Sequence, residues 1–237
     1  MKLFMNRFIS IATTAQLEDI QSLQGLPALS AKTFAAHKPD AHWVLVQNEI
    51  IRASCSLWWQ NTPAYLEHQV GLIGHYQAEN DEAAAFLINH ACQQLIEQHC
   101  TIAIAPMDGN TWRRYRFIID RGSKPIFFLE PDNSDKWVNH FQSQEFTVLA
   151  SYQSSINTDL TYVDPRMEKV AARMHDLGVQ IRPLKIADFE TELERIYQLS
   201  IVSFRNNFLY TPIDRSEFIT QYRQIKPYVN TDLTLLA

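Results

Sequence analysis

The sequence predicts a mixed α/β protein in which helices pack against one sheet. The first observation is a pair of apolar runs about a polar turn in residues 42–60, followed by a third apolar run in 64–77. This pattern is typical of neighbouring β-strands. The second observation is a change of period at Asp81, after which helical and short apolar segments alternate. Three meandering strands followed by alternating helices and strands predict a mixed sheet flanked by helices.

Each early element follows from a local pattern. Residues 13–38 carry apolar side chains at helical spacing and contain a proline, which predicts one or two short helices. In 42–60 the turn falls at Gln47–Glu49, and Pro63 marks the turn before the third strand. From Asp81 onward one helical face collects the apolar side chains Ala84, Leu87, Ile88, Ala91, Leu95 and Ile96.

The segments after this helix continue the alternation. Residues 101–107 are short, apolar and β-branched, which is typical of a buried central strand. We expect a helix in 110–119, a strand in 125–130, a helix in 134–144 and a strand in 146–154. The sheet and its helices would then fill a domain over residues 1–160.

The pattern changes after this domain. A helix is expected in 163–178, because Asp164 and Pro165 favour its start and Gly178 its end. A strand in 179–185, a helix from Asp188, a further polar segment and a strand-like end in 232–237 follow. We therefore predict a helical linker over 161–177 and, over 178–237, the incomplete start of a second domain similar to the first.

Composition narrows the possible partners. The net charge of −5 offers no broad basic surface, so nucleic acid is not an expected partner. No apolar run reaches the length of a membrane span, and no cleavage-site pattern follows the N-terminus, so we expect a cytoplasmic protein without a membrane segment. The histidines lack metal-site spacing, and the cysteines are expected to be buried thiols, so no metal site is predicted.

Three stretches carry a family resemblance: VGLIGHYQAENDEAAAFLINHACQQLIEQ, IAIAPMDGNTWRRYRF and PIFFLEPDNSDKWVNHFQSQEFTVLASYQSS. This progression resembles the GNAT superfamily of acetyltransferases, and specifically the N-terminal half of a tandem protein with two such domains. The resemblance implies transfer of an acetyl group from acetyl-CoA to an amine of a small molecule or peptide. It also implies a central strand, here Gly71–Ala78, that separates from its neighbour and pairs with the pantetheine arm.

The resemblance assigns the cofactor pyrophosphate to the following loop and helix start, where free amides and the helix dipole favour an anion. The residues that it assigns to acetyl-CoA are Tyr76, Ala78, Asn80, Ala83, Ala84 and Ala85. Of the family's loop pattern, Arg/Gln-x-x-Gly-x-Gly/Ala, only the final alanine is present. Asp81 and Glu82 place two carboxylates at the expected phosphate position, and a well-capped helix start is the alternative interpretation.

No catalytic residue is assigned by the resemblance. Phe141 stands where the family has a tyrosine that can protonate the leaving thiolate, so Tyr115 and His75 become the candidates. Their alternatives are a half-buried packing tyrosine and a hydrogen-bonded core histidine. Asp108 and Asn110 follow the central strand and would either bind a polar substrate or form a turn and helix cap.

The role of three tryptophans and two alternative functions of the chain stay open. Three tryptophans would either line an acceptor cleft or belong to the core: Trp58, Trp59 and Trp112. The departures from the family pattern leave two further functions, a degenerate domain that supports a partner domain and a protein that binds a small molecule without transfer. In the acetyltransferase that the resemblance implies, catalysis would reside mainly in the second domain. An unpaired strand at the end of the sequence would favour a homodimer.

Overall fold

The computed structural model describes residues 6–127, 129–159, 161 and 163–237 and confirms the mixed α/β class. The chain divides into two units. The first comprises residues 1–150 and 206–211, and the second comprises 151–205 and 212–237. The domain boundaries that the sequence suggests, at residues 160 and 177, stay a prediction.

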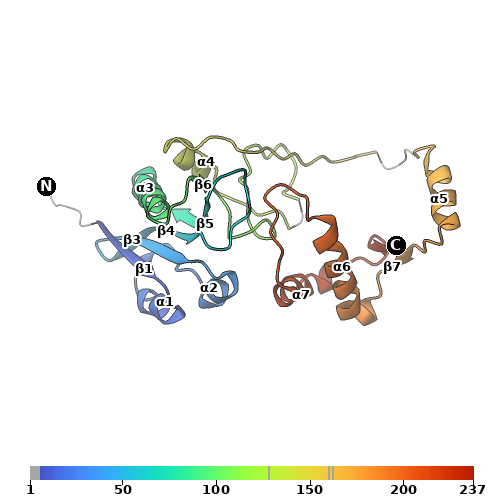
Figure 1. Ribbon diagram of the computed structural model, residues 1–237, viewed down its shortest axis with the longest axis horizontal. Coiled ribbons are helices and arrows are strands. Elements are labelled where there is room, and N and C mark those ends of the chain that lie inside the picture. The colour runs from blue at the N-terminus through green and yellow to red at the C-terminus, as the bar shows by residue number, and fades with distance from the viewer. Residues whose placement is uncertain (1–5, 128, 160, 162) are drawn as a thin grey trace. The chain divides into compact units, whose positions relative to one another are not determined.

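The first unit is built on a mixed sheet (Figure 1). Its strand order is β1–β3–β4–β5–β6, and β2 pairs with β4. Neighbouring strands from β1 to β5 are antiparallel, whereas β6 runs parallel to β5 and β2 parallel to β4. The strands are β1 (Asn6–Ile11), β2 (Gln24–Gly25), β3 (Ala41–Gln47), β4 (Ile50–Trp58), β5 (Val70–Ala78) and β6 (Ile102–Ile104).

The predicted hairpin in 42–60 is confirmed. Asn48 and Glu49 form the turn, with φ angles of 52° and 59°. Two central residues with positive φ give a turn whose twist matches that of the flanking strands. The third strand of the prediction is β5. The strand predicted in 101–107 is present as β6, but its predicted central, fully buried position is wrong: β6 lies at the end of the described strand order, and Ile102 and Ala103 are only half-buried. Strand β1 was not predicted, because Asn6, Arg7 and Ser10 interrupt its apolar pattern.

Helices cover both faces of this sheet (Figure 1). Helices α1 (Thr14–Ile20) and α2 (Ala31–His37) lie on one face, and α3 (Asp81–Glu97) and α4 (Asp135–Gln142) lie on the other. The alternation of strand side chains explains both layers: Val44 and Val46 pack with α1 and α2, while Leu45 packs with α3. The predicted helices in 13–38, from Asp81 and in 134–144 are thus confirmed.

Three predicted elements are wrong. Residues 110–119 form no helix, and the described residues of 125–130 and 146–154 form no strand. In the first segment, tertiary hydrogen bonds hold an irregular backbone: Trp112 Nε1 donates to the Thr211 carbonyl and Arg113 donates to the Asp108 carbonyl. The other two segments have β-propensity, but their described residues pair with no strand of the sheet, and propensity without a pairing partner does not make a strand.

The second unit contains small elements. They are α5 (Met167–Asp176), β7 (Arg182–Pro183), a 3₁₀ turn (Ile186–Asp188), α6 (Phe189–Ser203), α7 (Arg215–Arg223), a 3₁₀ turn (Lys226–Tyr228) and β8 (Leu235–Leu236). The two short strands pair antiparallel. The helices predicted in 163–178 and from Asp188 are present, but the strands predicted in 179–185 and 232–237 shrink to two residues each.

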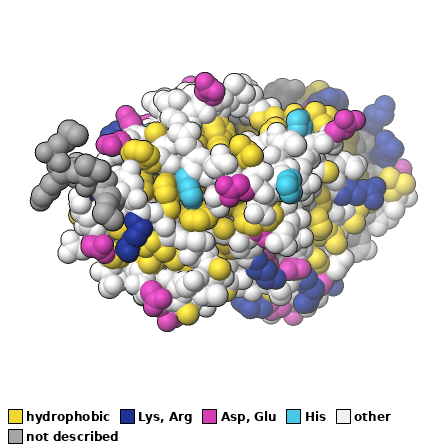
Figure 2. Space-filling model, turned by 60° about the vertical axis from the view of Figure 1, so that its left-hand side comes forward, with side chains coloured by type: hydrophobic (Ala, Val, Ile, Leu, Met, Phe, Trp, Pro, Cys, Tyr) yellow, Lys and Arg dark blue, Asp and Glu magenta, His cyan; other side chains and the backbone are white. Residues whose placement is uncertain are grey.

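Charged groups of both signs are scattered over the face of the molecule drawn in Figure 2. A further carboxylate, that of Glu192 in the second unit, is fully buried. The Glu192 carboxylate accepts hydrogen bonds from Arg182 at 3.0 Å and Arg195 at 2.7 Å. The Arg182 hydrogen bond is the largest cause that lowers the pKa of Glu192. This pairing explains how α6 buries a carboxylate.

Candidate functional site

The candidate site lies where β5 and β6 separate. The two strands pair only over Val70–Leu72 and Ile102–Ile104, and β5 then continues to Ala78. The chain leaving β6 stays close to β5 for a further step, because the Met107 amide donates to the Ile73 carbonyl at 2.9 Å. A Cβ atom on Gly74 would lie 2.2 Å from the Met107 carbonyl oxygen, so only glycine permits this approach.

Asp108 fills the start of the gap between the strands. Its side chain accepts a hydrogen bond from the His75 backbone amide at 2.6 Å, and the carboxyl group is buried. Desolvation by burial raises the pKa of Asp108, while the His75 amide and the nearby arginines oppose that rise. The chain's own carboxylate therefore engages an amide on the strand that the family resemblance assigns to the pantetheine arm.

A row of polar side chains continues from Asp108 beneath α2. His42 Nδ1 and His75 Nδ1 each lie 2.8 Å from Ser56 Oγ. His75 Nε2 lies 2.8 Å from His37 Nδ1. Burial is the largest cause that lowers the pKa values of His37, His42 and His75 to about 3. The three imidazoles are therefore neutral at physiological pH, and Ser56 is too deeply buried to act as a nucleophile.

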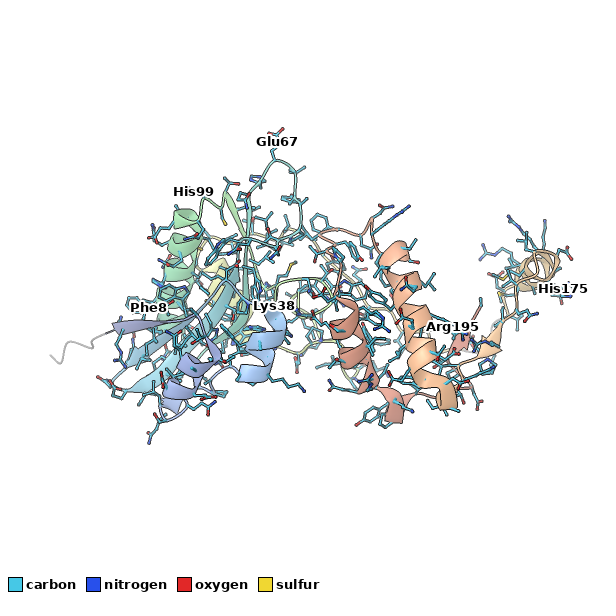
Figure 3. The ribbon with its side chains drawn as sticks, turned by 60° about the horizontal axis from the view of Figure 1, so that its bottom comes forward. Phe8, Lys38, Glu67, His99, His175 and Arg195 are labelled. Atoms are coloured by element: carbon cyan, nitrogen blue, oxygen red, sulfur yellow. The ribbon has the colours of Figure 1, made fainter. Side chains whose placement is uncertain are left out.

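A pocket of about 340 Å³ opens beside this row. It is bounded by the segment that enters α2, by α2 itself and by the separated end of β5; Figure 3 labels Lys38, which follows His37 at the end of α2. Its lining side chains include His37, His75, Asp108, Arg114 and Trp137. The pocket thus combines neutral imidazoles, a carboxylate, a guanidinium and an aromatic ring.

Arg114, which is half-buried, carries the positive charge of this pocket. Its guanidinium carbon lies 5.8 Å from the centre of the Trp137 ring. Among the described residues, this guanidinium receives no hydrogen-bond or ion-pair partner. By contrast, the neighbouring Arg113 donates to the Asp108 carbonyl at 2.9 Å. Arg114 is therefore available to an incoming anion, whereas Arg113 holds the loop.

The start of α3 is closed by its own residues. Asn80 Oδ1 accepts a hydrogen bond from the Ala83 amide at 2.9 Å, and the Asn80 carbonyl accepts one from the Ala84 amide at 3.0 Å. Ala83 and Ala84 are buried in the core, and Ala85 is half-buried. Asp81 accepts a hydrogen bond from His140 at 3.1 Å. This helix start fits a pyrophosphate poorly, because the Asn80 cap occupies the Ala83 amide and the first turn carries two carboxylates.

The other predicted cofactor residues belong to the sheet. Tyr76 is buried, and its hydroxyl lies 2.8 Å from His140 Nδ1. Burial raises the pKa of this hydroxyl. Ala78 pairs with Ala53 across the β4–β5 ladder. The assignment of these residues to acetyl-CoA stays a prediction.

The two catalytic candidates have different surroundings. His75 lines the pocket, as a catalytic candidate would, and is also hydrogen-bonded to Ser56, as the core-histidine alternative expects. The two interpretations of His75 do not exclude each other. Tyr115 packs against the cluster that contains Trp58 and Met107, and Arg116 donates to its hydroxyl. Tyr115 is not among the pocket's lining residues.

The remaining sequence candidates have structural contacts. Trp58 is buried and donates to the His37 carbonyl at 2.9 Å, and Trp59 is half-buried against the main core. Phe141 is buried with its ring 4.7 Å from that of Tyr76. Asn110 accepts a hydrogen bond from the Trp112 amide at 2.9 Å, which is a turn contact, and no helix follows.

The polar row could have been found from strand alternation. Ser54 and Ser56 in β4 occupy alternate positions, as do His75 and Gln77 in β5. The alignment of His42 opposite Ser56 depends on the register of β3, and Arg114 lies on an irregular segment. Neither of these placements leaves a periodic signal in the sequence.

No family model, curated protein or solved structure matches the chain. Within the described ranges, no group of three or more histidine, cysteine, aspartate or glutamate side chains could hold a metal ion. In the same part of the chain, no helix is both long and apolar enough to cross a membrane.

Proposed function

We propose that the chain belongs to an N-acetyltransferase of the GNAT superfamily, which transfers an acetyl group from acetyl-CoA to an amine of a small molecule or peptide. In this proposal the first unit is a degenerate GNAT-like domain. It binds a small ligand in the pocket beside β5, and acetyl transfer takes place mainly in a second domain. A cytoplasmic location belongs to the same proposal. The expected homodimer is not retained, because that expectation rests on an unpaired strand at the end of the sequence, whereas β8 pairs with β7.

The separation of β5 from β6 carries the proposal. A parallel pair that parts after three residues, with a pocket beside it and a helix directly after the longer strand, is the arrangement that the resemblance implies for this superfamily. A crevice at the carboxyl ends of parallel strands is also a general place for ligands. The pocket volume lies within the range of small-molecule sites.

The assignment of acetyl transfer mainly to a second domain rests on the local chemistry. Asp108 engages the His75 amide, and the Asn80 cap engages two amides of α3. Asp81 and Glu82 would repel a pyrophosphate at the same helix start. Phe141 also lacks a proton to give to a thiolate. These features argue against acetyl-CoA binding in the first unit and support the proposal that transfer takes place elsewhere.

The alternative is an active first unit, and two side chains on the pocket wall favour it. His37 and His75 are neutral imidazoles on the pocket wall, and a neutral imidazole accepts a proton from an amine more readily than an imidazolium does. Their low pKa values make them weak bases. The active-unit alternative requires acetyl-CoA to bind residues 1–150.

Titration calorimetry of acetyl-CoA into the 237-residue chain at low salt distinguishes a degenerate first unit from an active one. We expect no binding, and none in the double variant D81A/E82A, because the Asn80 cap still occupies the Ala83 amide. Micromolar binding that is lost in Ala85→Glu would overturn the proposal in favour of an active first unit. Ala85 is suited to this test because it is half-buried, whereas a large side chain at the buried Ala84 would disturb the core.

A further inference from the structure

Two opposite charges face the same pocket without forming a direct pair. Asp108 and Arg114 both line it, and no ion pair within 4.0 Å joins them among the described residues. They are close enough for each charge to influence the other, because Arg114 is one of the groups that lower the pKa of Asp108. A ligand with two opposite charges could therefore contact both.

The Asp108 end of the pocket suits a cation. Asp108 Oδ1 already accepts the His75 amide, and Oδ2 lies 4.0 Å from His75 Nε2, beyond hydrogen-bonding distance. The carboxylate is only 6% exposed, so a cation that reached it would be shielded from water. An ammonium group there would satisfy lone pairs that the protein leaves open.

The Arg114 end suits a carboxylate. The guanidinium lies over the Trp137 ring, which restricts its position, and the described residues give it no hydrogen-bond acceptor. An arginine fork binds a planar carboxylate with two parallel hydrogen bonds. A bare amine would be repelled here, just as a bare carboxylate would be repelled by Asp108.

The wall between α1 and α2 adds an apolar surface. Pro27, Ala28 and Leu29 line the pocket together with the two charges. An aliphatic group on the ligand would cover this surface and remove it from water. The ligand would then have three parts: an ammonium group, a carboxylate and an aliphatic side chain.

We propose that this pocket binds a zwitterionic α-amino acid with an aliphatic side chain, with its ammonium group at Asp108 and its carboxylate at Arg114. The inference rests on the proposed function only in taking the pocket as a ligand site. It names the ligand class and does not require acetyl-CoA to bind.

The test is a calorimetric titration of leucine into the full chain without acetyl-CoA. Two analogues isolate the charges: 4-methylpentanoate lacks the ammonium group, and 3-methylbutylamine lacks the carboxylate. We expect leucine to bind about tenfold or more tightly than either analogue, because each charge-assisted hydrogen-bonding group contributes at least that factor. Equal or tighter binding of either analogue, or no binding of leucine, would overturn the proposal.

Two variants assign the charges to their residues. Arg114→Gln should weaken leucine about tenfold or more and leave 3-methylbutylamine no weaker. Asp108→Asn keeps an acceptor for the His75 amide, so it should preserve the fold while weakening leucine and leaving 4-methylpentanoate no weaker. Unchanged leucine affinity in Arg114→Gln, with thermal melting like that of the wild type, contradicts the proposal even if Asp108→Asn fails to fold.

The matched controls are Arg173→Gln and Asp19→Asn, which remove the same charges from exposed positions on α5 and α1. Leucine affinity should be unchanged in both; a loss comparable to that in the pocket variants would show a general charge effect and overturn the assignment. The acetyl-CoA titration is a separate measurement, so binding of acetyl-CoA would refute the degenerate first unit without refuting the amino acid site.

Discussion

At the scale of single residues, the row from His42 to His37 fixes which nitrogen atoms carry protons. Ser56 has one hydroxyl proton and lies between two imidazoles, so at least one imidazole must donate to its oxygen. His42 Nε2 is buried and lacks a partner among the described residues. An unpaired N–H is rarer in buried sites than an under-used acceptor, so we expect the His42 proton on Nδ1.

This arrangement predicts a loss of stability in acid. His42 is fully buried with a pKa of about 3, whereas the unfolded chain binds the same proton near 6.5. As the pH falls from about 6 to 4, the unfolded state takes up the proton first, so this histidine should lower the free energy of unfolding by ~1.4 kcal/mol per pH unit. Denaturant unfolding of wild type and His42→Gln across this range measures the difference in slope.

The control for this prediction is His175→Gln, which replaces an exposed histidine on α5 (Figure 3). Its slope should match that of the wild type. If His42→Gln also keeps the wild-type slope, burial of His42 is not a source of the acid sensitivity.

At the scale of elements, α3 depends on its cap. Asn80 adopts an extended backbone, and its side chain accepts the Ala83 amide, as an N-cap residue does. Asn80→Ala should lower the free energy of unfolding by about 1 kcal/mol, because it leaves that amide without its partner. Asn80→Asp retains the acceptor and should stay close to the wild type.

Thermal or denaturant unfolding of the two variants checks this role. Equal stability of Asn80→Ala and wild type would contradict the capping account and leave the amide available to other ligands. A loss in both variants would indicate that the asparagine's amide group, and not its oxygen, is what stabilises the helix start.

Sequence patterns predicted the elements that carry their own periodicity. The hairpin, β5 and α3 follow from alternation or helical spacing, and all three are present. Residues 110–119 look helical by spacing, but Trp112 and Arg113 hydrogen-bond to distant carbonyls and keep the segment irregular. The pocket escaped prediction because Asp108 and Arg114 meet through that irregular segment and not through a repeating pattern.

At the scale of the whole molecule, the first unit is not a continuous stretch of sequence. Residues 206–211 belong to it, and Leu209 is buried in a cluster with Trp58, Leu72 and Met107. The local sequence around Leu209 gives no sign of this long-range packing. The first unit therefore depends on a segment that follows most of the second unit in the chain.

Leu209→Ala should thus destabilise the first unit. Removing a buried leucine side chain costs about 2–5 kcal/mol through lost burial and the cavity left behind. The matched control is Leu199→Ala on α6, where the leucine is 64% exposed and the loss should be small. Denaturant unfolding followed by the fluorescence of the tryptophans, all of which lie in the first unit, measures both; equal effects would contradict the packing account.

The central claim is that the pocket beside β5, and not the start of α3, is the ligand site of the first unit. Amide chemical-shift mapping by NMR, with leucine added first and acetyl-CoA second, tests it most directly. The account predicts that leucine shifts the amides of His37, His75 and Asp108, and that acetyl-CoA leaves those of Ala83 and Ala84 unchanged. Shifts at Ala83 and Ala84 on adding acetyl-CoA, with no response of the pocket to leucine, would contradict it.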